Sequence, residues 1–264
     1  MGFLARWSAA WQERLEARIL QRRPIPDTLW IETLARYPFI ARRDADDLAL
    51  LRRLATLFLA RKEFTGAGGL TATDEIATAI AMQACLPILQ LGLESYDSFV
   101  GIVVHPDEVI AQREHVDDAG VVHAYEETLS GEAMSGGPVM LNWHDAARSG
   151  GPDERAYNVV IHEFVHVLDM RDGIPDGIPL LATRAQQQHW RQVLEQEYEI
   201  FCRSLEHDDD PVIDPYGAEA PEEFFAVAAE AFFVTPQLLQ QSQPMLYRLL
   251  QDYFRQDPAR AGLA

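Results

Sequence analysis

Cysteine is scarce in this chain of 264 residues: Cys85 and Cys202 are the only two, and no CxxC pattern occurs. Two isolated cysteines argue against a disulfide framework and against a thiolate zinc site. A clean membrane-spanning run is also lacking, because Gln83, Pro87 and Gln90 interrupt the most apolar stretch, residues 76–93. We therefore expect a cytoplasmic protein in which this stretch is a core helix.

Basic residues are in deficit as well. The chain has 22 Lys and Arg against 41 Asp and Glu, a net charge of −19, which argues against direct binding to nucleic acid or to an anionic membrane. The first 26 residues lack the apolar core of a secretory signal. In this segment Trp7, Trp11, Leu15 and Ile19 recur at helical spacing. They predict an amphipathic helix that packs on its own domain, with a membrane or partner contact as the alternative.

The rest of the pattern predicts an α+β fold that is predominantly helical. Helices are expected at 3–22, 27–36, 44–64 and 73–93, and β-branched runs predict strands at 98–106, 120–129 and 138–143. Residues 130–138 are expected to form a loop beside a sheet edge. A helix is predicted to begin near Pro152, and the remainder of the chain is expected to be helix or coil. No internal repeat or long linker marks a domain boundary.

The stretch NVVIHEFVHVLDM, residues 158–170, contains the most informative motif. On a helix His162 and His166 differ by about 40° around the axis, so both imidazoles can bind one ion. The arrangement is HExxH, in which two neutral imidazoles hold Zn²⁺ and the adjacent carboxylate, Glu163, reaches the attacking water. The alternative is a pair of core histidines satisfied by hydrogen bonds, but burying them with Glu163 carries a cost that a metal ion offsets.

A catalytic zinc ion takes three protein ligands, so a third ligand must lie elsewhere in the chain. Glu230 is the favoured candidate, since it is the only polar residue between Phe224 and Val234 on a predicted helix. A lone buried carboxylate requires a cation, and small alanines beside it would let this helix approach the histidine helix. Glu222 and Glu223 are weaker candidates, because the helix dipole is reason enough for acids in a first turn.

Asp172 competes with Glu230 for the third position, because it follows His162 by the ten residues found in HExxHxxGxxH/D enzymes. The glycine on which that pattern turns is replaced here by Asp169. We expect Asp169 instead to hydrogen-bond a ligand imidazole and fix its tautomer. Capping and turning the chain is an equally good explanation for Asp169, Asp172 and Asp176.

An oxyanion that develops during peptide hydrolysis also needs a hydrogen-bond donor. Tyr216 is our candidate, because it lies in a loop that leads into the Glu230 helix. An ordinary packing role explains Tyr216 equally well.

At these residues the chain resembles the Mlc titration factor A (MtfA) family of zinc peptidases. The resemblance runs through TATDEIATAIAMQACLPIL, SGEAMSGGPVMLNW, VVIHEFVHVLDMRDGIPDGIP, EEFFAVAAEAFFVTP and LYRLLQDYFRQDP. It implies a zincin-like catalytic core, a glutamate third ligand that falls on Glu230, and cytoplasmic peptidase activity, mainly aminopeptidase. The predicted strands add a small β-sheet to this core, and the three convergent ligands predict one Zn²⁺ per chain. It also implies binding to a glucose repressor of the Mlc type. Met134 stands where the family pattern has tryptophan. We expect this difference to change the shape of the substrate pocket and not the chemistry.

These observations predict one zincin-like domain, 1–264, in which 1–94 is a helical N-terminal portion and 95–264 the catalytic core. The expected function is hydrolysis of peptide substrates by a zinc-activated water, together with repressor binding that regulates sugar-uptake genes. The alternative is a regulatory protein that sequesters a transcription factor and has only a structural zinc. Glu163 favours catalysis, since a structural site needs no carboxylate beside the water position.

Overall fold

The computed structural model describes residues 3–116, 122–151, 156–207 and 211–260. Its first half contains α1 (Phe3–Arg22), α2 (Asp27–Arg36), α3 (Pro38–Ala41), α4 (Ala45–Arg61), β1 (Glu63–Gly66), α5 (Asp74–Cys85), η1 (Leu93–Tyr96), β2 (Gly101–His105), β3 (Val109–Val116) and β4 (Val122–Leu129). The second half contains β5 (Gly131–Ala133), β6 (Val139–Asn142), α6 (Trp143–Arg148), α7 (Val159–Asp169), η2 (Met170–Asp172), α8 (Arg184–Ser204), η3 (Pro215–Ala218), α9 (Pro221–Val234), α10 (Pro236–Ser242) and α11 (Pro244–Phe254).

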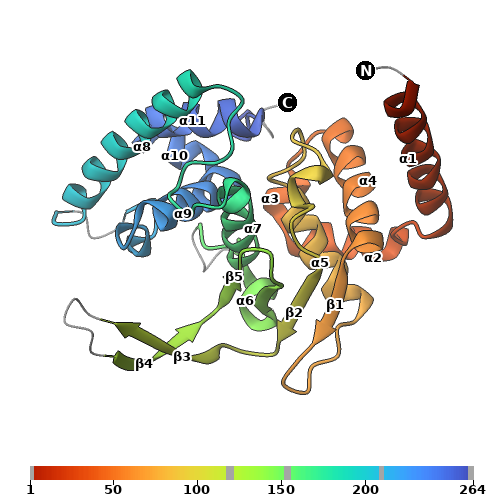
Figure 1. The fold of residues 1–264 in the computed structure, drawn as a ribbon, viewed down its shortest axis with the longest axis horizontal. Coiled ribbons are helices and arrows are strands. Elements are labelled where there is room, and N and C mark those ends of the chain that lie inside the picture. Colours follow the sequence, from red (N-terminus) through yellow and green to blue (C-terminus); the bar gives the residue numbers. More distant parts are fainter. Residues whose placement is uncertain (1–2, 117–121, 152–155, 208–210, 261–264) are drawn as a thin grey trace.

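The expected α+β class is confirmed, because the chain is mostly helical and has a small mixed sheet. The strand order is β1-β2-β6-β5. β1, β2 and β6 run parallel, whereas β5 pairs antiparallel with β6 and ends the sheet. β3 and β4 form a separate antiparallel ribbon that extends to one side of the molecule (Figure 1). α7 lies centrally, between the N-terminal helices and the group formed by α8 to α11 (Figure 1).

Several boundaries differ from the expectation. The helix predicted to end near residue 64 stops at Arg61, because Glu63–Gly66 pairs with β2 as β1. The apolar helix ends at Cys85 rather than near 93, just before Pro87, which cannot donate a backbone hydrogen bond. The expected loop at 130–138 contains β5, and β3 and α6 were not predicted.

The histidine helix begins later than expected. Residues 152–155, where its first turn was predicted, lie outside the described residues, and α7 starts at Val159. Asn158 provides the N-cap: its Oδ1 accepts a hydrogen bond from the N–H of Ile161 at 2.9 Å. Its Nδ2 donates to Oε1 of the buried Gln83 on α5, also at 2.9 Å. The start of α7 is therefore tied to the core helix that was predicted from the apolar stretch.

α7 is enclosed by apolar side chains on most sides. Phe164 makes edge or tilted ring contacts with Phe58, Tyr96 and Phe99, at centroid distances of 5.1–5.7 Å. On another side α7 packs against α9, which is buried from Phe224 to Val234. The alanines of α9 allow this close approach, as expected. Only the polar residues of α7 distinguish it from an ordinary core helix.

The N-terminal amphipathic helix, α1, packs on its own chain. The carboxylate of Glu16 pairs with Arg53 at 2.8 Å and with Arg61 at 2.7 Å, and both arginines belong to α4. Trp11 stays largely exposed. Among the described helices, none combines the length and the apolar character that a membrane crossing requires.

Candidate metal centre

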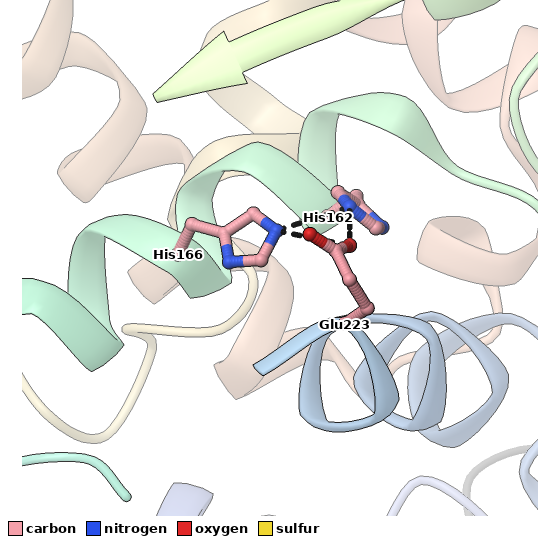
Figure 2. A group of neighbouring side chains, drawn as sticks. All are labelled: His162, His166 and Glu223. Carbon is pink, nitrogen blue, oxygen red and sulfur yellow. Dashed lines mark hydrogen bonds and ion pairs between the residues drawn. The ribbon is translucent and has the colours of Figure 1, made fainter. Parts of the chain in front are cut away.

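His162 and His166 project from the same face of α7, as their spacing predicts. Their ring centroids lie 4.8 Å apart and the rings are inclined at 77°. The two Nε2 atoms are 3.1 Å apart. Each imidazole thus presents the same ring nitrogen to one small volume (Figure 2).

Glu223, in the first turn of α9, brings a carboxylate to that volume. Its Oε2 lies 3.1 Å from Nε2 of His162 and 3.4 Å from Nε2 of His166. This oxygen is buried and has no hydrogen-bond partner. Ligand atoms about 2.0–2.1 Å from a tetrahedral zinc ion lie about 3.3 Å from one another. The three separations therefore fit a tetrahedral ion with its fourth position open.

Glu230 takes a different place from the one expected for a third ligand. Its Oε1 lies 2.8 Å from Nδ1 of His162, on the side of the ring opposite the nitrogen that faces His166. Its Oε2 accepts a hydrogen bond from the backbone N–H of Asn158, and the residue is 2% exposed. If Nδ1–H of His162 donates to Glu230, Nε2 keeps its lone pair for a metal ion. Glu230 therefore has the position of a residue that orients His162.

The electrostatics of the cluster call for a positive charge. Burial lowers the pKa of His162, but its contacts with Glu223 and Glu230 outweigh this effect and raise that pKa well above its ordinary value. Burial also raises the pKa of Glu223, whereas its ion-pair contacts with His162 and His166 hold that pKa far below the usual range. A proton on the imidazoles or a divalent cation can supply this charge, and a cation does so with both imidazoles neutral.

Glu163 lies one step around α7 from the ligand face and is 5% exposed. Burial raises the pKa of its carboxyl, while the two imidazoles and the backbone of Ala133 lower it. Strand β5 covers the side chain closely: a Cβ built on Gly131 would stand 2.6 Å from both Cγ and Oε1 of Glu163. The edge strand can lie over this carboxylate only because residue 131 has no side chain.

A cavity of about 290 Å³ opens beside these groups. Tyr216 stands on its wall, with its ring centroid 6.1 Å from that of His162. The residue is 44% exposed. The cavity is lined by Ser130, Gly131, Tyr157, Val159, His162, Glu163, Asp214, Tyr216, Glu219, Val227 and Glu230.

The aspartates after the motif act on the loop, not on the imidazoles. Oδ2 of Asp169 accepts a hydrogen bond from the N–H of Gly177 at 2.9 Å, and Oδ1 is buried without a partner. The expected bond from Asp169 to a ligand imidazole is thus absent among the described residues. Burial raises the pKa of Asp169 to about 7. Asp172 and Asp176 cap local turns by accepting from Ile174 and Ile178, both at 3.1 Å.

The residue that sequence reasoning undervalued is Glu223. The helix dipole alone explains an acid in the first turn of α9, so its position there indicates no further role. A better signal is present in the spacing: Glu223 and Glu230 are seven residues apart, so both point from one face of the helix. Glu223 lies in the first turn of α9, near Nε2 of His162. Glu230 lies deep in the core and reaches Nδ1 of the same imidazole.

Comparison with known proteins finds a family model and several relatives that match most of the chain. The model of the glucose-regulated metallo-peptidase M90 family matches residues 10–255. A protein named Mlc titration factor A from Pectobacterium atrosepticum is 35% identical over 225 residues, covering 84% of this chain and 83% of its own. Its namesake from Salmonella arizonae is 34% identical over 241 residues, covering 89% and 93%. An uncharacterized protein from Synechocystis is 36% identical over 250 residues, covering 94% and 90%.

The contact between Gly131 and Glu163 generates a prediction about stability. Gly131→Ala should lower the free energy of unfolding in urea by about 1–3 kcal/mol, because the added methyl group overlaps a buried side chain. Gly101→Ala is the matched control, since a Cβ on this other strand glycine meets only Pro138, at 3.4 Å. The loss should shrink when Glu163 is also replaced by alanine. An equal effect of the two glycine substitutions would show that β5 does not press on Glu163.

Proposed function

Because the chain belongs to the glucose-regulated metallo-peptidase M90 family, we propose that it is a zinc-dependent peptidase whose ion is held by His162, His166 and Glu223. The observation that carries this proposal is the set of three ligand atoms at 3.1–3.4 Å from one another, beside a buried carboxylate that is not among them. This choice replaces Glu230 with Glu223 as third ligand and keeps one zinc ion per chain.

The protein side chains divide the chemistry among them. When bound, zinc polarises the scissile carbonyl and acidifies a coordinated water. Glu163 accepts the proton of the attacking water and returns it to the leaving amine; the raised pKa of its carboxyl suits both steps. Glu230 holds His162 through Nδ1. Tyr216 is the proposed donor to the developing oxyanion, supported by its position on the cavity wall near His162.

Substrate is proposed to bind as an added strand along β5. This short strand ends the sheet and lies directly over Glu163, so a peptide paired with its outer edge would pass the reacting groups. Met134, which follows β5 and is 44% exposed, is then placed to contact the substrate. The zincin-like core and the one-domain organisation are part of the same proposal.

Aminopeptidase specificity is the finer part of this proposal. It rests on the family resemblance and is supported by the acidic wall of the cavity. Asp214 and Glu219, both exposed, line the cavity together with Glu163, and carboxylates are suitable partners for a substrate's free α-ammonium group. Cleavage of a short peptide but not of its N-acetylated form is the expected result.

The three ligand candidates can be separated by their effect on zinc binding. Glu223→Gln should weaken zinc binding strongly, because it removes an anionic ligand, whereas Glu230→Gln should weaken it only about 10- to 100-fold, as expected of a residue that orients a ligand. Asp172→Asn should leave it unchanged, since that carboxylate caps a local turn. Competition with a zinc chelator measures these affinities on folded protein. A larger loss in Glu230→Gln than in Glu223→Gln would restore Glu230 as the third ligand.

Substitution of Glu163 tests the catalytic role. Glu163→Gln should keep zinc and fold but lower kcat on a cleavable peptide by about 10²- to 10⁴-fold, because it removes the proton acceptor, while KM changes much less. Zinc content must be measured on the same sample. Turnover at the native rate by the zinc-loaded variant would mean that Glu163 is not the base and would favour a non-catalytic function.

The alternative function is that of a regulatory protein that sequesters a transcription factor and has a structural zinc. Relatives of this chain carry the name Mlc titration factor A, and on that basis we propose a cytoplasmic protein that also binds an Mlc-like repressor and so affects sugar-uptake genes. Glu163 supports chemistry over a purely structural site, since a structural ion does not need it. The two activities are compatible in one chain.

Repressor binding can be tested apart from catalysis. We propose that an Mlc-like repressor contacts a surface outside the cavity. The purified repressor should then bind the wild-type chain and the Glu163→Gln variant with equal affinity in calorimetry. Absence of heat with wild-type protein at micromolar concentrations, at two well-separated temperatures, would rule out the repressor as a partner. If the wild-type chain binds the repressor and the zinc-loaded Glu163→Gln variant does not, the repressor binds at the catalytic cavity instead.

A further inference from the structure

Gly177 is a buried loop residue that contacts three helices, α7, α8 and α9. The N–H of Gly177 donates to Oδ2 of Asp169, the last residue of α7, at 2.9 Å. The carbonyl of Gly177 accepts a hydrogen bond from Nε1 of Trp190, on α8, at 2.8 Å. Both peptide groups of this loop residue are therefore held by buried side chains, one from the histidine helix and one from α8.

Gly177 also presses on the start of α9. A Cβ at this position would lie 2.6 Å from the carbonyl oxygen of Pro221 and 3.0 Å from Cδ2 of Leu194. Pro221 is the first residue of α9 and precedes Glu223 by two positions. The ring of Trp190 packs edge-on against Phe225, two positions after Glu223, at a centroid distance of 5.2 Å. Gly177 and Trp190 thus contact α9 two residues before and two residues after Glu223.

The first turn of α9 has no side-chain cap, and within it Phe224, next to Glu223, packs on Tyr198 and Phe201 of α8. Its N-cap residue is Ala220, whose side chain makes no capping hydrogen bond, although most of the other long helices here have a side-chain cap. The end of a helix without such a cap frays easily. Contacts from the neighbouring loop and from α8 must then hold Glu223 at the 3.1–3.4 Å from the imidazoles that an ion requires.

We propose that Asp169, Gly177 and Trp190 form a brace that sets the position of Glu223 relative to His162 and His166, and that these three are positioning residues of the metal centre. The proposal rests on the proposed function, in which Glu223 is a zinc ligand. It gives Asp169 a role other than contact with an imidazole. The Asp169 carboxylate holds the loop at Gly177, and this loop supports α9, the helix that carries Glu223. A brace of this kind affects zinc affinity, whereas a contact that only stabilises the fold does not.

The loop supplies a matched pair of glycines for the test. Gly173 and Gly177 both have positive φ, 94° and 76°, so alanine is strained at either position. A Cβ on Gly173 meets nothing within 4 Å, whereas one on Gly177 collides with Pro221. Gly177→Ala should therefore weaken zinc binding about 10- to 100-fold in chelator competition, the range for residues that orient ligands. Gly173→Ala should bind zinc as the wild type does, with a similar loss of stability from backbone strain.

Gentler variants keep the proposal testable if Gly177→Ala does not fold. Trp190→Phe preserves an aromatic ring against Phe225 but removes the N–H that holds Gly177, so it should weaken zinc binding to a smaller extent. Asp169→Asn retains an acceptor for Gly177 and should bind zinc better than Asp169→Ala. In cobalt-substituted protein, the visible spectrum should shift in Gly177→Ala and not in Gly173→Ala, because only the former displaces a ligand.

The outcomes separate the brace from the proposed function. Wild-type zinc affinity and an unchanged cobalt spectrum in folded Gly177→Ala and Trp190→Phe, with zinc binding lost in Glu223→Gln, would overturn the brace and leave the ligand assignment standing. Wild-type zinc affinity in Glu223→Gln would instead overturn the ligand assignment, and the brace with it. Weakened binding in Gly177→Ala but not in Gly173→Ala is the result that supports the brace.

Discussion

The candidate metal centre depends on the packing of α9 against α7. Alanines on α9 let the two helices lie close, and two glutamates, seven residues apart on one face of α9, then meet the same imidazole from opposite sides. Glu230 reaches Nδ1 of His162 and Glu223 reaches Nε2. One helix contact therefore supplies both a candidate ligand and the residue that sets the tautomer of another ligand.

Burial gives this arrangement its chemical character. Glu163 and Glu230 are buried, and Glu223 and Glu230 both contact His162. Three carboxylates in such surroundings are costly without positive charge. A divalent ion offsets that cost while both imidazoles stay neutral. The same burial raises the pKa of Glu163, which is what a group that takes up and releases a proton requires. Burial is therefore the common cause of the cost of these charges and of the proposed catalytic role of Glu163.

Much of this could be predicted from the sequence, for identifiable reasons. The spacing of His162 and His166, and the helix that carries them, follow from the periodicity of an apolar segment. That a second apolar helix with small residues would lie against it also followed from its composition. The short strands β1 and β5 could not be predicted, because strands of three or four residues gain their stability from pairing partners distant in the sequence. In the β-ribbon, β4 was predicted and β3 was not. The choice between Glu223 and Glu230 was limited for a similar reason. The sequence shows that both residues lie on one face of α9, but not how far along α9 the histidine helix contacts that face.

The central claim is that one ion is held by Nε2 of His162, Nε2 of His166 and a carboxylate oxygen of Glu223. Crystallography of the zinc-loaded protein, with anomalous scattering recorded at the zinc edge, tests it most directly. We predict a single peak about 2.0–2.2 Å from these three atoms, with Glu230 on Nδ1 of His162 and no direct contact with the ion. A peak coordinated by Glu230, or one away from the two histidines, would contradict the claim.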